Sequence, residues 1–188
     1  LIITDSGVPC EYSLEIAKKC KYSLIHTINA GEESKNLANF EQILRIMAEN
    51  KFTRSDCVVA VGGGSVGDTV GFACSIYKRG VNVLHVPTTL LAMVDSSVGG
   101  KTAVDLPEGK NLIGVFHQPS AVLIDPGFLR TLPPRELHCG MAEVIKMALT
   151  SDRELFELFE KHLKLIQYLK SDQLFDFPKL LKIQLQKK

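Results

Sequence analysis

Short apolar runs alternate along the chain with segments in which apolar residues recur every three or four positions. The run 57–61 is wholly apolar and breaks into Gly62-Gly63-Gly64-Ser65-Val66-Gly67-Asp68. This pattern predicts a buried parallel strand that ends in a tight turn, and the small apolar residues 69–77 predict a helix packed on it. The same reasoning predicts further strands at 1–5, 22–28, 81–86 and 122–125, and helices at 12–20 and 36–49. Strands that alternate with helices indicate an α/β fold with a doubly wound parallel sheet and right-handed crossovers.

The pattern becomes wholly helical from Arg135 onward, after the boundary Leu132-Pro133-Pro134. We therefore expect a sheet domain over residues 1–134 and the start of a helical domain over residues 135–188. An amphipathic helix is predicted over 151–169, with Ser151 and Glu154 as a capping box. Since the chain opens without methionine inside an apolar strand and closes in a helical pattern, we expect a fragment of a longer protein.

Composition narrows the class of protein. A hydrophobic share of 45% with 23% charged residues is typical of a soluble globular enzyme. The net charge of +1 gives no reason to expect a nucleic-acid partner. No apolar run approaches the roughly 18 to 20 residues that span a bilayer, so no membrane partner is expected. Five cysteines without a C-x-x-C pair indicate reduced thiols and a cytoplasmic protein.

Several polar residues come directly after predicted strands, where parallel sheets bind ligands. The glycine turn either aims backbone N–H groups and a helix N-terminus at a phosphate or is only a tight turn. Asp5 either bonds a ribose hydroxyl or forms a turn, whereas Glu32 and Lys35 by themselves indicate a solvated helix start. Thr88 and Thr89 also come directly after a predicted strand. The spacing is not G-x-G-x-x-G, so the motif does not by itself predict a standard dinucleotide site.

Residues 93–119 show weak periodicity, which predicts a long irregular segment, and such segments are usually functional. Lys101 and Lys110 offer two cations, and Asn111 a neutral donor and acceptor, for an anionic ligand. Asp95 is suited to general acid–base work or to binding hydroxyls. The alternative is a flexible surface loop with ordinary lysines.

Glu143 and Lys146 are three residues apart and share one face of a predicted helix. They predict a surface ion pair. Glu143 could instead bind a metal, but a metal needs two or three further protein ligands. No H-E-x-x-H occurs, and the five histidines are scattered.

Six strings together closely resemble the 3-dehydroquinate synthase family, over residues 1 to about 158. They occur in order and are Gly-Gly-Gly-Ser-Val-Gly-Asp (62–68), Tyr-Lys-Arg-Gly (77–80), Val-Pro-Thr-Thr-Leu-Leu (86–91), Val-Asp-Ser-Ser-Val-Gly-Gly-Lys-Thr (94–102), Gly-Lys-Asn-Leu-Ile-Gly (109–114) and Ala-Glu-Val-Ile-Lys (142–146).

The resemblance implies a Rossmann-like NAD-binding domain followed by a helical domain that binds metal and substrate. It implies an enzyme of the shikimate pathway of aromatic amino acid biosynthesis, dependent on NAD and on Zn²⁺ or Co²⁺. The implied reaction converts 3-deoxy-arabino-heptulosonate 7-phosphate to 3-dehydroquinate and phosphate, with transient oxidation by NAD. The implied assembly is a homodimer.

The resemblance also assigns residues. Those expected along NAD are Asp5, Glu32, Lys35, Gly63, Gly64, Asp68, Thr88, Thr89, Lys101, Lys110, Phe128, Thr131, Leu132 and Glu136. Those expected at the substrate are Asp95, Lys101, Lys110, Asn111 and Lys146, with Arg79 reaching the substrate of the neighbouring subunit. Glu143 is expected to be a zinc ligand.

The chain departs from the family in two respects. None of its histidines matches the two that complete the family's zinc site. Residues 170–188 also fit the family poorly. We therefore expect that this chain alone neither assembles the metal site nor is active. Three alternatives stay open: another sugar-phosphate cyclase such as 2-deoxy-scyllo-inosose synthase, an iron-dependent alcohol or glycerol dehydrogenase relative, and a non-catalytic dinucleotide-binding module.

Overall fold

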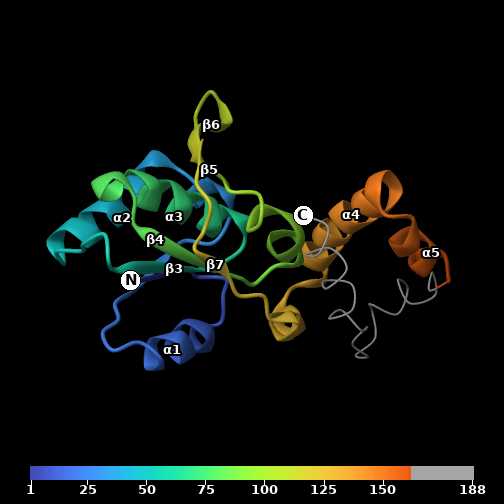
Figure 1. Cartoon of the computed structure of the whole chain (residues 1–188), viewed down its shortest axis with the longest axis horizontal. Coiled ribbons are helices and arrows are strands. Elements are labelled where there is room, and N and C mark those ends of the chain that lie inside the picture. The colour runs from blue at the N-terminus through green and yellow to red at the C-terminus, as the bar shows by residue number, and fades with distance from the viewer. Residues whose placement is uncertain (162–188) are drawn as a thin grey trace.

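The computed structural model describes residues 1–161, and a five-stranded parallel sheet lies at their centre (Figure 1). Its strand order is β2-β1-β3-β4-β7. All four neighbouring pairs are parallel. The strands are β1 (Ile2–Asp5), β2 (Ile25–Ile28), β3 (Cys57–Gly62), β4 (Asn82–Pro87) and β7 (Ala121–Val122). The predicted α/β fold with a parallel sheet is confirmed.

Helices cover both faces of this sheet. Figure 1 shows α2 (Leu37–Glu49) and α3 (Gly64–Ile76) on one side and α1 (Cys10–Lys18) on the other. Successive strand residues point to opposite faces, so Ile3 joins the core beneath α2 and α3 while Ile2 joins the core beneath α1. Both faces of β1 and β3 are therefore buried, which is why the run 57–61 is continuously apolar.

The prediction of an irregular segment over 93–119 was wrong. A π-helical turn, η3 (Ala92–Ser96), is followed by an antiparallel hairpin of β5 (Lys101–Leu106) and β6 (Gly109–Phe116), which projects from the sheet in Figure 1. Most of β6 is exposed on both faces, so it lacks the alternation by which a half-buried strand is recognised. The hairpin packs on α3, where a Cβ on Gly71 would lie 2.5 Å from Thr102 Cγ2.

The starts of α1, α3 and α5 (Arg153–Lys161) also differ from prediction, and α1 begins at Cys10 rather than at 12. Helix α3 begins at Gly64 rather than at 69, because burial against the sheet outweighs the low helix propensity of its glycines. Helix α5 is capped by Asp152, whose Oδ1 accepts from Leu155 N at 3.1 Å, and not by Ser151. The remainder of the predicted helix over 151–169, like residues 170–188, lies outside the described residues.

Helix α4 (Pro134–Ser151) and α5 share a core with η3. Met93 and Val94 pack there with Met141 and Val144, so the helical part is tied directly to the turn that carries Asp95. The division into domains at residue 134 stays a prediction. Of the helices within residues 1–161, none has the length and apolarity that crossing a membrane requires.

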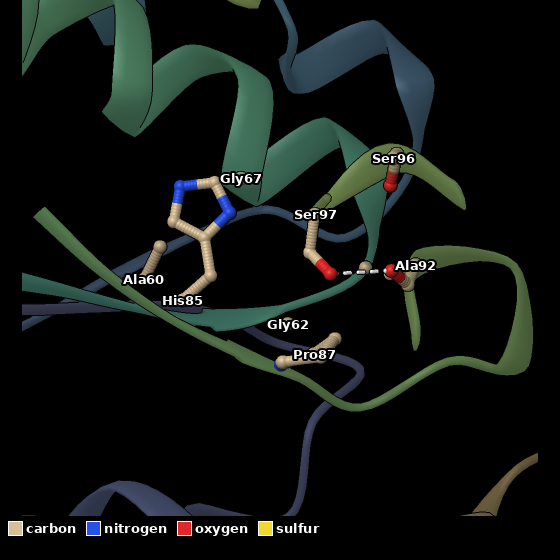
Figure 2. A pocket seen from close by; sticks show the side chains of 9 residues that line it. Ala60, Gly62, Gly67, His85, Pro87, Ala92, Ser96 and Ser97 are labelled. Carbon is tan, nitrogen blue, oxygen red and sulfur yellow. Dashed lines mark hydrogen bonds between the residues drawn. The ribbon is translucent and has the colours of Figure 1, made fainter. Parts of the chain in front are cut away.

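His85 is buried between β4 and α3, beside a hollow of about 10 Å³ (Figure 2). Its ring lies against Gly67, and within residues 1–161 its Nε2 has no hydrogen-bond partner. Burial, with a smaller contribution from the charge of His117, lowers the pKa of His85 to about 4. The imidazole is therefore neutral in the folded chain near pH 7.

We expect the free energy of unfolding to fall as the pH drops from 6.5 towards 4. In that window the unfolded chain protonates His85 and the folded chain does not, so acid favours unfolding, by about 2 kcal/mol between pH 7 and about pH 4.5. Urea unfolding at the two pH values measures this difference. The control is His85→Gln, which stays neutral and loses that part of the pH dependence. An equal drop in both proteins would contradict the prediction.

Candidate functional site

The carboxyl ends of β1 and β3 lie side by side at a topological switch point. Strand β1 pairs with β2, the next strand along the chain, on one side and with β3 on the other. Open α/β sheets bind ligands at such points. A hollow of about 860 Å³, here called the first hollow, lies there. It is lined by the predicted residues Asp5, Glu32, Lys35, Gly63, Gly64, Asp68, Thr88, Thr89, Thr131, Leu132 and Glu136, and also by Tyr12, Ser65 and Ser96.

The N-terminus of α3 forms the floor of the first hollow. Gly63 is the N-cap residue, and no side chain caps the helix, so the first N–H groups of α3 are left for a ligand. Both Gly63 and Gly64 line the hollow. A side chain on Gly63 would occupy this cradle, since its Cβ alone would lie 3.1 Å from Thr89 Cγ2. This end of the helix suits an anion such as a phosphate.

Two carboxylates stand at the rim of the first hollow. Asp5 Oδ1 accepts from Gly7 N at 2.7 Å, so Asp5 both forms a turn and lines the hollow; burial raises its pKa. Glu32 accepts from Ser65 Oγ at 2.8 Å and lies 3.3 Å from Lys110 Nζ. Burial would raise the pKa of Glu32, but Ser65, Lys35 and Lys110 together hold it below the ordinary value. Both acids can accept hydrogen bonds from hydroxyl groups.

Lys35 is not part of a solvated helix start, and that prediction was wrong. The residue is only 4% exposed. Its Nζ donates to Asp68 Oδ2 at 2.6 Å and to Asn111 Oδ1 at 2.5 Å. Burial raises the pKa of Asp68, while the ammonium of Lys35 opposes that rise. Sequence reasoning missed this because the partners lie 33 and 76 residues away along the chain.

A second hollow, of about 600 Å³, lies between the hairpin and η3. Asp95, Lys101 and Asn111 line it, and Asp68 and Ser96 line both hollows. The two hollows are therefore neighbours. Lys110 does not line the second hollow; its ammonium pairs with Glu32 at the rim of the first.

The acid–base pair on α4 lies close to Asp95. Lys146 Nζ donates to Glu143 Oε1 at 2.7 Å, which confirms the predicted ion pair. Glu143 raises the pKa of Lys146, and the charge of Asp95 adds to this effect. Glu143 is a single carboxylate: residues 1–161 bring no three His, Cys, Asp or Glu side chains together at a point where a metal could bind.

Five predicted residues line neither hollow: Lys110, Glu143 and Lys146, described above, and Arg79 and Phe128. Arg79 follows α3 in the short turn η2 (Tyr77–Arg79), with φ +64°. Phe128 packs against the Tyr12 ring, with centroids 4.5 Å apart. Tyr12 also shares a hydrogen bond of 2.7 Å with Thr131, which brings α1 to the wall of the first hollow. The sequence predicted only a helix that begins at Tyr12, so no sequence signal marked Tyr12 as a lining residue.

Known sequences are similar to this chain. The profile of the 3-dehydroquinate synthase N-terminal family matches residues 25–139. The 3-dehydroquinate synthase of Sulfurimonas denitrificans is 50% identical over 159 residues, 84% of this chain and 45% of the relative. That of Nostoc punctiforme is 53% identical over 148 residues, 78% of this chain and 41% of the relative. The chain thus spans less than half the length of these curated relatives.

Solved structures share the fold. The 2-epi-5-epi-valiolone synthase of Streptomyces hygroscopicus, described with NAD⁺ and Zn²⁺ bound, has a TM-score of 0.88 and 34% identity, over 98% of this chain and 52% of that one. A 2-deoxy-scyllo-inosose synthase complexed with carbaglucose-6-phosphate, NAD⁺ and Co²⁺ has a TM-score of 0.73 and 38% identity, over 77% of this chain and 40% of that one. The matched profile covers more than half of the sequence, and the chain belongs to the 3-dehydroquinate synthase family.

Proposed function

We propose that this chain is the NAD-binding part of a 3-dehydroquinate synthase, which converts 3-deoxy-arabino-heptulosonate 7-phosphate to 3-dehydroquinate and phosphate. The observation that carries the proposal is the pair of adjoining hollows that share Asp68 and Ser96. The first offers an uncapped helix N-terminus between two carboxylates. The second offers the ammonium of Lys101 and the carboxamide of Asn111.

The first hollow fits a dinucleotide. The free N–H groups at Gly63 and Gly64 would hold the pyrophosphate, and Asp5 and Glu32 would accept hydrogen bonds from ribose hydroxyls. The rest of the cofactor would lie along Thr88, Thr89, Thr131, Leu132 and Glu136. When bound, NAD would supply a transient hydride acceptor. The cyclases of similar structure are described with NAD⁺ bound, which supports this assignment.

The second hollow fits a sugar phosphate. Lys101 would offset the negative charge that grows on the phosphate as it leaves, and Asn111 would donate hydrogen bonds to it. Asp95 would hold the reacting hydroxyls or exchange a proton with them. Lys146 would join it there, since the two charges already influence each other. Arg79 lines neither hollow, which is compatible with its serving the neighbouring subunit of a homodimer.

The residues described do not by themselves fit a metal. Zn²⁺ at a catalytic site takes three protein ligands, and Glu143 is a single carboxylate held by Lys146. No catalytic step is therefore assigned to a metal on residues 1–161. Glu143 remains our proposed contribution of this chain to a metal site that other residues would complete.

We expect this chain to bind NAD⁺ and the variant Asp5→Ala to bind it about tenfold more weakly, because a charge-assisted hydrogen bond is lost. Isothermal titration calorimetry measures both dissociation constants. The matched control is Asp56→Ala, since Asp56 also accepts from a nearby backbone N–H but belongs to the turn at Thr53. Equal affinity in the Asp5→Ala variant and the unaltered chain would contradict the placement of Asp5.

A chimera tests the reaction itself. Residues 1–159 replace the matching segment of the Sulfurimonas denitrificans relative, and phosphate release is followed with catalytic NAD⁺ and added Zn²⁺. We expect release from 3-deoxy-arabino-heptulosonate 7-phosphate, and a decrease of about 10²-fold or more in the Asp95→Asn chimera, because the acid–base group is removed.

Each alternative predicts a different outcome of that assay. Release from glucose 6-phosphate alone would favour another cyclase. Alcohol oxidation without phosphate release would favour a dehydrogenase. NAD binding without either reaction would favour a non-catalytic module. Any of these results from a chimera that binds NAD would overturn the proposal.

We expect the 188-residue chain to retain less than about one tenth of an equivalent of Zn²⁺ after dialysis, because a single carboxylate cannot hold the ion. Atomic emission on the dialysed protein measures the ratio, and Glu143→Gln should give the same value. One tightly bound equivalent that Glu143→Gln removes would refute this expectation.

A further inference from the structure

Lys35 contacts the hairpin through both its backbone and its side chain. Its carbonyl oxygen accepts from Asp105 N at 2.8 Å on β5, and its ammonium donates to Asn111 Oδ1 at 2.5 Å on β6. The same ammonium donates to Asp68 Oδ2 at 2.6 Å on α3. Lys35 therefore joins Asp68, one of the two residues that line both hollows, to the hairpin that forms one wall of the second.

These contacts fix the orientation of the Asn111 carboxamide. An ammonium can only donate, so the carboxamide atom that faces Lys35 must be the oxygen. Both N–H groups of the carboxamide then remain available to donate to another acceptor. Among residues 1–161 the nitrogen has no hydrogen-bond partner, and Asn111 lines the second hollow. The backbone of Asn111 has φ +57° and its N–H donates to Asp105 Oδ1 at 2.7 Å. That uncommon backbone conformation is held by Lys35 and Asp105 together.

We propose that Lys35 is a positioning residue, which couples the first hollow to the hairpin and sets the Asn111 carboxamide to donate into the second hollow. Its ammonium donates to both Asp68 and Asn111, so Lys35 acts on the second hollow through these two side chains. Asn111 thereby becomes a donor suited to an anionic oxygen. The ligand part of this inference rests on the proposed function, whereas the coupling to the hairpin does not.

Hydrogen exchange tests the coupling without any ligand. We expect Lys35→Met to speed exchange of the amides over 101–116 by tenfold or more, with β3 amides unchanged. Asn111→Ala should also speed exchange of the amides over 101–116, although it leaves the Lys35–Asp68 pair in place. If the two residues act through one contact, the double variant should exchange no faster than Lys35→Met. The control is Lys18→Met, whose ammonium pairs with Glu15 on exposed α1.

Ligand binding separates positioning from direct contact. We expect Lys35→Met to weaken binding of inorganic phosphate to the NAD-saturated chain tenfold or more. Asn111→Asp keeps an oxygen for Lys35 but removes the donor. It should leave hairpin exchange unchanged and still abolish phosphate binding.

Three results would overturn the proposal. One is a tenfold loss of NAD⁺ affinity in Lys35→Met with the hairpin unaffected, which would make Lys35 a direct nucleotide ligand. The second is hairpin exchange that stays unchanged in Asn111→Ala, which is the variant to rely on if Lys35→Met does not fold. The third is phosphate binding by Asn111→Asp that is as tight as binding by the unaltered chain. Failure of the unaltered chain to bind NAD⁺ would instead refute the proposed function, and the exchange experiment would still decide the coupling.

Discussion

The buried ion pair between Lys35 and Asp68 is the contact on which both hollows depend. A buried ammonium or carboxylate is costly unless it is paired and hydrogen-bonded, and here each supplies the other's partner. The pair forms only when the loop before α2 lies against the first turns of α3. The third partner, Asn111, then draws in the hairpin. The pair thus restricts how three separate segments can sit relative to one another.

Local pattern predicts the sheet well and the hairpin poorly, for one physical reason. The run 57–61 is buried on both faces, so its composition reports its environment directly. By contrast, β6 is mostly exposed and finds its place by pairing with β5 and by the contacts of Asn111. Such contacts leave no period in the sequence. The helix start at Gly64 was missed likewise, because tertiary packing overrides intrinsic propensity.

Some residues of the candidate site could likewise be placed from the sequence, and others could not. Residues that follow strands, such as Asp5 and Thr88, can be placed at one edge of the sheet from sequence, because parallel strands end together. The burial of Lys35 and the separation of Lys110 from Lys101 could not be foreseen, since both follow from side-chain partners remote in sequence. The resemblance to a family named these residues as a group, but it did not say which of them touch one another.

The hairpin, and not the sheet, supplies Lys101 and Asn111 to the second hollow. An iron-containing alcohol dehydrogenase from Thermotoga maritima has a TM-score of 0.61 at 16% identity, which is a likeness of fold alone. The strings 94–102 and 109–114 supply Asp95, Lys101 and Asn111 to the second hollow of this chain. A common fold can therefore carry different chemistry, according to the side chains that stand beside its sheet. The contact from Lys35 to Asn111 matters because it connects a residue of the first hollow to the hairpin that lines the second.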